Sequence, residues 1–300
     1  MIEVEHLTKR YGTLTAVDDL SFTVRPGVVT GLLGPNGAGK TTTMSIVLGL
    51  QAPTSGRTLV AGRAYRDLDR PLHEVGALLD AAAVHSGRNA RAHLLWVAQS
   101  NGISSSRVDE VLGIVGLDSV AGKRLRGYSL GMKQRLGIAQ ALLGNAPVLI
   151  FDEPVNGLDA EGIGWIRRLL KQLAAEGRTV LVSSHLMGEM SLTADHLVVI
   201  GRGKLLADAS LDDFIATHTR SDLFVRTPAA ATLAGLLRER GADVVEDGAE
   251  LIVNGVAAEE VGEIAAANGT VLYQLVTRRA TLEDAYLALT HESVEFGSPA

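Results

Sequence analysis

Cysteine is missing from the sequence, which has 300 residues. Disulfide bonds and thiolate metal sites are therefore excluded, and a reducing cytosol is the simplest compartment for the chain. A basic run of Lys and Arg is also missing, and the formal net charge is −6. Nucleic-acid-binding proteins usually carry such a basic stripe, so we predict no nucleic-acid partner.

Long apolar runs are missing as well. A membrane-spanning helix needs about 20 consecutive apolar residues. The two most apolar stretches, 41–56 and 136–151, are shorter and are interrupted by Pro, Gly, Asn or Gln. The first residues, 1–5, are acidic and alternating, unlike a secretory signal peptide. We expect a chain that is soluble on its own and that works at a membrane only through a partner.

The composition is that of a globular protein, with 46% hydrophobic and 21% charged residues. Apolar segments typical of buried strands recur at 28–33, 148–151, 179–183 and 197–200, with helical patterns between them. Buried strands that alternate with helices predict a largely parallel α/β sheet, and a mostly helical block at about 85–145 is inserted into it.

The composition shifts near 217–220, and we predict two domains, residues 1–217 and residues 220–300. The elements expected beyond the boundary are a strand at 223–226, a helix at 229–240, strands at 244–246 and 250–253, a helix at 257–268, a strand at 271–276 and a helix at 282–289. The first six follow the β-α-β-β-α-β order of a ferredoxin-like unit. We predict a small C-terminal α+β domain without a catalytic constellation.

A glycine-rich octapeptide follows the buried strand at 28–33 and precedes a helix expected at 41–50. It fits the phosphate-loop pattern G-x-x-x-x-G-K-[ST] with Gly34, Pro35, Asn36, Gly37, Ala38, Gly39, Lys40 and Thr41. The glycines let backbone N–H groups turn toward phosphate oxygens, and the helix N-terminus favours an anion. Lys40 would contact the β- and γ-phosphates, and Thr41 would offer a hydroxyl to Mg²⁺. The strand–helix context disfavours the alternative, a glycine-rich turn that binds nothing.

Two carboxylates, Asp152 and Glu153, follow the apolar segment 148–151. Asp152 is placed to hold Mg²⁺, directly or through water, and Glu153 to polarise an attacking water. An isolated acidic pair would indicate a solvated loop, but the buried strand before it and the phosphate loop favour catalysis. We therefore predict a site that binds ATP with Mg²⁺ and hydrolyses it.

A third motif lies between these two: Tyr128-Ser129-Leu130-Gly131-Met132-Lys133-Gln134-Arg135-Leu136. It resembles the signature motif of the nucleotide-binding subunits of ATP-binding-cassette (ABC) transporters, and the resemblance covers about 1–217. It implies a P-loop NTPase fold of the ABC type with an inserted helical subdomain. It also implies that Ser129 and Gly131 open a helix that faces the γ-phosphate held by a second copy of the protein.

Further positions match this family in their order along the chain. Tyr11 matches an aromatic residue that stacks on adenine, Asp159 the acidic member of a loop that crosses the dimer interface, and His185 a switch histidine at the γ-phosphate. Thr42, which directly follows the phosphate loop, is also expected to bind the nucleotide. Without the resemblance, Tyr11 would be a half-buried strand tyrosine and His185 a structural histidine. The resemblance makes Glu153 and His185 the expected catalytic pair.

Two positions depart from the family pattern. Asp80 follows a strand expected at 75–79, where the family usually has glutamine. Because an ionised Asp only accepts hydrogen bonds, we expect it to contact a metal or a coupling partner. Leu130 stands where the family prefers glycine. The signature segment, the loop 156–159 and the segment 281–286 are similar to a subgroup of bacterial drug and antibiotic-resistance exporters of the ABC-2 type.

The resemblance implies a function. Two copies would sandwich two ATP molecules and power a separate integral membrane permease, at the cytoplasmic face of the bacterial plasma membrane, that exports a drug, an antibiotic or another hydrophobic compound. The C-terminal domain would support dimerisation, dock to the permease or act as a structural cap. A soluble ABC-type ATPase acting on ribosomes or nucleic acid is the alternative. A single phosphate loop, the lack of a heptad run and the acidic balance disfavour it.

Overall fold

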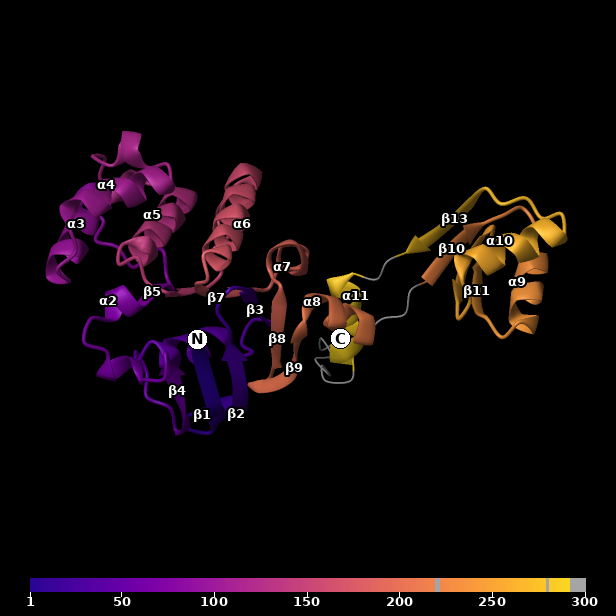
Figure 1. The fold of residues 1–300 in the computed structure, drawn as a ribbon, viewed down its shortest axis with the longest axis horizontal. Helices are drawn as coiled ribbons and strands as arrows, with labels where there is room; N and C mark the ends of the chain where they lie inside the picture. Colours follow the sequence, from indigo (N-terminus) through magenta and orange to yellow (C-terminus); the bar gives the residue numbers. More distant parts are fainter. Residues whose placement is uncertain (219–221, 279–280, 292–300) are drawn as a thin grey trace. The chain divides into compact units, whose positions relative to one another are not determined.

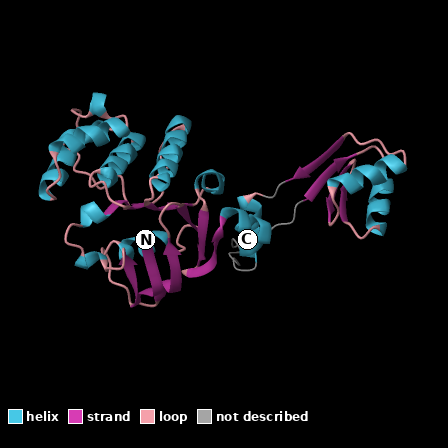
Figure 2. Cartoon of the chain, in the orientation of Figure 1, coloured by secondary structure: helices cyan, strands magenta, loops and turns pink. Residues whose placement is uncertain are grey.

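The computed structural model describes residues 1–218, 222–278 and 281–291. The chain divides into two compact units, Met1–Leu211 and Asp212–Ala300. The boundary expected from composition, 217–220, lies at the end of α8 (Leu211–His218) and extends into residues outside the described part. Figures 1 and 2 show the elements of each unit. No helix of the described ranges is long and apolar enough to span a membrane.

The main sheet of the first unit has the order β5-β6-β7-β3-β8-β9. Its strands are β3 (Val29–Leu33), β5 (Val75–Leu78), β6 (Val148–Phe151), β7 (Thr179–Ser184), β8 (His196–Gly201) and β9 (Lys204–Ser210). Neighbouring strands are parallel except for β9, which pairs antiparallel with β8. These pairings confirm the predicted, largely parallel α/β sheet, and its central strands are buried along their whole length, as in other parallel sheets.

A second, antiparallel sheet has the order β2-β1-β4. Its strands are β1 (Ile2–Tyr11), β2 (Leu14–Val24) and β4 (Ser55–Val60). Met44 of α1 (Lys40–Val47), Val4 of β1 and Ile150 of β6 belong to one buried core that joins this sheet to the main one. Gly49, with φ of 65°, follows α1 in the left-handed region, so the helix ends before the predicted residue 50.

The helical block and the helices after it cover the main sheet. Their bounds are α2 (Pro71–Glu74), α3 (Ala90–Ser100), α4 (Ser105–Ile114), α5 (Leu130–Leu142), α6 (Ala160–Ala175) and α7 (Met187–Thr193), with short 3₁₀ turns at 65–67, 118–120 and 125–127. A Cβ atom added to Gly76 of β5 would lie 1.9 Å from the carbonyl oxygen of Ala141. Helix α5 therefore sits directly on the backbone of β5.

The second unit contains a four-stranded antiparallel sheet of order β11-β12-β10-β13. Its elements are β10 (Asp222–Arg226), α9 (Ala230–Glu239), β11 (Asp243–Asp247), β12 (Glu250–Asn254), α10 (Ala258–Ala267) and β13 (Gln274–Arg278), followed by α11 (Leu282–His291). This is the strand order of the β-α-β-β-α-β unit predicted above. Strand β13 begins at Gln274, three residues later than expected, because Val271 and Leu272 belong to the connection before it.

Replacing Gly76 with alanine should lower the free energy of unfolding of the first unit by about 1–3 kcal/mol, because the new methyl group overlaps the Ala141 carbonyl. Chemical denaturation followed by tryptophan fluorescence measures this, since both tryptophans, Trp96 and Trp165, lie in the first unit. Gly113→Ala in α4 is the matched control, because a Cβ there meets nothing within 4 Å. Equal loss of stability in both variants would contradict the prediction.

Candidate active site

The phosphate loop joins β3 to α1 at the carboxyl end of the main sheet. Gly37 and Gly39 have φ of 82° and 104°, and a Cβ on Gly39 would lie 2.6 Å from the Ala16 carbonyl oxygen. These positions require glycine. Lys40 Nζ donates to the Gly34 carbonyl oxygen at 2.7 Å across the loop. Within the described residues no side chain caps α1, so its first N–H groups face the loop and suit an anion.

Asp152 is the buried carboxylate of the site and follows β6. Its side-chain Oδ2 accepts from Thr41 Oγ1 at 2.5 Å, and its Oδ1 accepts from the Ser183 hydroxyl. Its backbone N–H donates to the Leu78 carbonyl oxygen at 2.8 Å. With only 7% exposure, the carboxylate is fixed between the first turn of α1 and the end of β7.

Glu153 connects the phosphate loop to His185. Its Oε1 lies 3.7 Å from Lys40 Nζ, and its Oε2 lies 2.9 Å from His185 Nδ1. Its backbone has φ of 48°, the left-handed region that costs a non-glycine residue about 1–3 kcal/mol. Two contacts hold this conformation: Glu153 N–H donates to Ser183 Oγ at 2.9 Å, and Gln134 Nε2 donates to the Glu153 carbonyl oxygen at 3.1 Å.

A pocket lies over the phosphate loop. It is lined by Tyr11, Leu14, Ala16, Pro35, Asn36, Gly37, Gly39, Lys40, Thr41, Thr42 and Glu153. Tyr11 ends β1, is 45% exposed and donates its hydroxyl to Gln51 Oε1. Its ring is therefore held at the pocket wall, where a planar base can stack on it. The structure brings together most of the residues that the sequence assigned to the nucleotide.

Three predicted residues lie elsewhere, at the N-termini of α5 and α6. Ser129 accepts from the Met132 N–H at 3.2 Å and caps α5, and Asp159 accepts from the Gly162 N–H at 2.8 Å and caps α6. A Cβ on Gly131 would lie 2.6 Å from the Gly157 carbonyl oxygen, so the start of α5 packs on the loop before α6. These residues form a second surface, separate from the pocket over the chain's own phosphate loop.

Tyr128, just before this surface, fixes the start of α5. Its hydroxyl donates to the Val120 carbonyl oxygen at 2.9 Å, and burial raises the pKa of this phenol above its ordinary value. Tyr128 is therefore tied to the 3₁₀ turn at 118–120.

Asp80 lies near the same edge of the main sheet as Asp152, two residues after β5. Its Oδ1 accepts from the Ala82 N–H at 2.7 Å, which forms a local turn. The described residues contain no group of three or more His, Cys, Asp and Glu side chains arranged for a metal ion. A metal or coupling contact at Asp80 stays a prediction.

Two residues at the centre of the site were not assigned a role from sequence. Ser183 contacts both Asp152 and Glu153, and Gln134 reaches the backbone of Glu153 from α5. Ser183 was visible as a polar residue at the end of a buried strand, next to His185. Gln134 was visible as a member of the signature segment, and the structure shows that it is buried.

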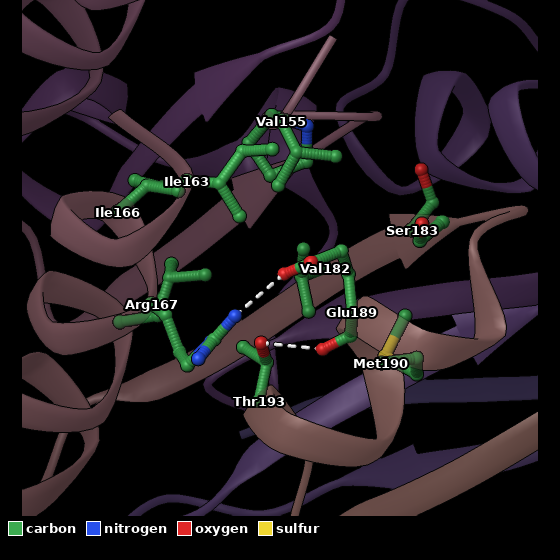
Figure 3. Close-up of a pocket in the computed structure, with 12 residues that line it drawn as sticks. Val155, Ile163, Ile166, Arg167, Val182, Ser183, Glu189, Met190 and Thr193 are labelled. Atoms are coloured by element: carbon green, nitrogen blue, oxygen red, sulfur yellow. Dashed lines mark hydrogen bonds and ion pairs between the residues drawn. The ribbon is translucent and has the colours of Figure 1, made fainter. Parts of the chain in front are cut away.

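A second, small pocket lies behind the carboxylates, between α6 and α7 (Figure 3). Arg167 Nη2 lies 2.9 Å from Glu189 Oε2, and Thr193 Oγ1 donates to the Glu189 carbonyl oxygen at 2.7 Å. This ion pair joins α6 to α7, the helix that directly follows the loop carrying His185. The other walls are mainly apolar, so the pocket packs helices together and is distinct from the nucleotide pocket.

The geometry defines a class of protein. A phosphate loop at a strand–helix junction faces a buried Thr41–Asp152 pair and a Glu153–His185 pair at neighbouring strand ends. This is the arrangement of a P-loop ATPase.

Comparison with known proteins narrows the class. A family profile described as ABC transporter matches residues 17–156, and a domain of unknown function matches residues 221–283. The uncharacterized ABC transporter ATP-binding protein YhcH of Bacillus subtilis (strain 168) is 35% identical over 98% of this chain and 97% of its own length. The bacitracin transport ATP-binding protein BcrA of Bacillus licheniformis is 43% identical over 71% of this chain and 70% of its own.

Solved structures share the fold. The structure of an ATP-binding subunit of an ABC transporter superposes with a TM-score of 0.66 at 26% identity, covering 72% of this chain and 92% of its own. A dimeric ATP-binding cassette solved with ADP and Pi gives a TM-score of 0.62 at 22% identity, covering 70% and 99%. The chain belongs to the ATP-binding proteins of ABC transporters. The predicted ATPase activity and the likeness to the antibiotic-transport subgroup are confirmed.

Replacing Ser183 with alanine should lower the kcat of ATP hydrolysis about 10- to 100-fold, because its hydroxyl orients both Asp152 and the strained backbone of Glu153. Steady-state phosphate release measures this. Ser191→Ala is the matched control, since among the described residues that hydroxyl contacts only a helix carbonyl, that of Gly188. A Ser183→Ala protein with the kcat of the unchanged chain would show that Asp152 and Glu153 need no such support.

Proposed function

We propose that two copies of the chain sandwich two ATP molecules and that the cycle of closing and hydrolysis drives a separate membrane permease that exports an antibiotic-like compound. One observation carries this proposal. The chain holds one half of an ATP site around Lys40, while Ser129 and Gly131 form a separate surface at the start of α5. A second copy can supply that surface to the γ-phosphate, as the N-terminus of a helix suits an anion.

The oxygen atoms at the start of α1 suit a hard divalent cation. Thr41 Oγ1 and Asp152 Oδ2, now 2.5 Å apart, would hold Mg²⁺ together with the phosphates, because hydroxyl and carboxylate oxygens are its preferred ligands. When bound there, Mg²⁺ supplies neutralisation of charge on the β- and γ-phosphate oxygens.

The protein side chains divide the remaining tasks. Lys40 exchanges its contact with the Gly34 carbonyl oxygen for the β- and γ-phosphates. Glu153 accepts a proton from the attacking water, and His185, 2.9 Å from Glu153 Oε2, orients that carboxylate and contacts the γ-phosphate. Tyr11 stacks on the adenine, and Asp159 lies in the loop that meets the second copy.

The free energy of ATP hydrolysis is used to drive a membrane partner. Relatives named for bacitracin and lantibiotic transport support an antibiotic as cargo. A relative from Paraburkholderia xenovorans (strain LB400), 34% identical, is named for Nod factor export, which supports the outward direction. The chain would bind peripherally to the cytoplasmic face of the membrane, with the helical block near 80–95 facing the permease. Nucleic acid is not a partner in this proposal.

Glu153→Gln should trap an ATP-bound dimer, because the amide keeps the shape of the side chain but cannot take the proton of the water. Light scattering after gel filtration with ATP and Mg²⁺ should show a dimer, and ATP turnover should fall at least about 100-fold. Glu161→Gln, in the first turn of α6, is the control. Turnover at the normal rate by Glu153→Gln would show that Glu153 is not the base.

The export proposal is tested by purifying the tagged chain from solubilised native membranes with ATP present. We expect a polytopic membrane protein to co-purify, since the chain itself powers transport only through such a partner. The variant Lys40→Ala, which lacks the phosphate contact, shows whether the association depends on nucleotide. Recovery of ribosomal or DNA-bound proteins in place of a membrane protein would favour the soluble alternative.

A further inference from the structure

His185 lies on a short loop between two elements of the first unit. Strand β7 ends at Ser184 and α7 begins at Met187, so His185 and Leu186 form the connection. Among the described residues the His185 side chain makes one polar contact, with Glu153 Oε2 at 2.9 Å, and it is 40% exposed. A side chain with so few contacts takes its position from the two ends of its loop.

The two ends are held in different ways. Strand β7 is buried along its whole length and lies between β6 and β3 in the main sheet, so it is fixed. Helix α7 has only seven residues, and in the described part of the chain no side chain caps its N-terminus. A helix this short is not stable by itself in water. Its position therefore depends on the groups that it packs against.

Three side chains hold α7 in place. Met190 packs on β3, because a Cβ atom added to Gly31 would overlap its sulfur atom. Asp195, which follows the helix, accepts from the Val29 N–H at 2.8 Å. Glu189 lies in the first turn of α7 and contacts α6. The first two contacts fix α7 to β3, whereas Glu189 fixes its first turn, the end next to the loop, to α6.

Arg167 supplies the other half of this contact from α6. Its Nη2 lies 2.9 Å from Glu189 Oε2, across the pocket of Figure 3, and the two side chains are only 30% and 27% exposed. The pocket walls around the guanidinium are mainly apolar, and among the described residues its Nε is buried without a hydrogen-bond partner. Loss of either member would therefore leave a partly buried charge uncompensated.

Helix α6 is a firm support for this contact. Its inner face buries Ile166, Leu170 and Leu173, and Asp159 caps its N-terminus. Asp159 belongs to the second surface, so one helix carries both a residue of that surface and the arginine that holds α7.

We propose that Arg167 and Glu189 are positioning residues for ATP hydrolysis. Their ion pair holds the start of α7 on α6, which keeps His185 against Glu153. Neither residue lines the nucleotide pocket, so both act only through the loop of His185. This inference rests on the role proposed above for His185.

Arg167→Met tests the proposal with little change in packing, because the new side chain suits the apolar walls but cannot donate to Glu189. Steady-state phosphate release should show a kcat about 10- to 100-fold lower, since a small displacement of a reacting group has an effect of this size. The Kd for ADP should be unchanged, because ADP has no γ-phosphate and the phosphate loop is intact. Calorimetry with ADP measures this.

The matched control is Arg178→Met. Arg178 also forms an ion pair at 2.9 Å, with Glu176, but it lies just before the other end of β7. This variant loses an ion pair of the same kind and should keep its kcat. A loss of kcat equal to that of Arg167→Met would show that ion pairs matter only through overall stability.

Charge reversal tests whether the two residues act as a pair. Arg167→Glu and Glu189→Arg alone each place like charges together and should lower kcat. The double variant restores an opposite-charge pair and should return kcat to within about threefold of the unchanged chain. Circular dichroism confirms that each variant is folded. Failure of the folded double variant to recover would overturn the proposal.

A cycle with His185→Ala separates positioning from stability. His185→Ala should lower kcat at least about 100-fold, and adding Arg167→Met should change it by less than about twofold, because no side chain remains to be positioned. A pair that only stabilised the fold would lower kcat equally in both backgrounds.

The outcomes distinguish this inference from the proposed function. Normal turnover by His185→Ala would overturn the role of His185 and this inference with it. If His185→Ala is impaired, then normal turnover by Arg167→Met, or an equal loss in both backgrounds, would overturn the positioning role alone. Weaker ADP binding by Arg167→Met would also overturn it, since the change would then have reached the nucleotide pocket.

Discussion

The buried carboxylate of Asp152 is the contact on which the rest of the active site depends. It accepts hydroxyl hydrogen bonds from Thr41 on α1 and from Ser183 on β7, and its own strand is β6. A charge this deep in the protein is tolerated only with such donors. These hydrogen bonds hold the start of α1 and the ends of β6 and β7 together, although the three segments are far apart in sequence. The position of Glu153, the next residue, is therefore fixed by the same contacts.

The strained backbone of Glu153 follows from this arrangement. Its left-handed φ turns the chain sharply at the end of β6, which directs the side chain toward Lys40 and His185 rather than along the strand. Ser183 and Gln134 hold that turn from β7 and α5. The helical block thus contributes to the geometry of the reacting carboxylate through a single side-chain amide, although its signature surface lies elsewhere.

The sequence was sufficient wherever a local pattern decides the structure. The phosphate loop, the buried strands and the βαββαβ order of the C-terminal unit are each written in short periodic or motif-like segments. Strands β4 and β9 were not predicted, because residues such as Ser55, Gly56 and Lys204 are polar and exposed. These strands form because β4 pairs with β1 and β9 pairs with β8. A local sequence pattern does not show which strand will be the neighbour.

The site residues, too, could be predicted where a short local motif contains them. Lys40, Thr41, Asp152 and Glu153 lie in recognisable motifs, and the structure places them together. The contacts of Ser183 required knowledge of which strand lies beside β6. The side chain of Asp80 was expected to contact a metal or a coupling partner, which stays a prediction; the structure adds that its Oδ1 accepts from the Ala82 N–H, a local turn that a pattern of residue types does not reveal.

The close contact between β5 and α5 has a mechanical consequence. Gly76 brings the C-terminal end of α5 against the backbone of β5, and Gly144, just after the helix, packs on the Leu72 backbone in α2, while Ser129 stands at the other end of the helix. The helix is about 20 Å long, and its start is held by the contacts of Tyr128 with the Val120 carbonyl oxygen and of Gly131 with the loop before α6. A rotation of about 10° about the C-terminal end of α5 would move Ser129 by about 3.5 Å, which is more than the roughly 3 Å between the heavy atoms of a hydrogen bond. Small rotations at the sheet can therefore make or break contact with a phosphate at the far end.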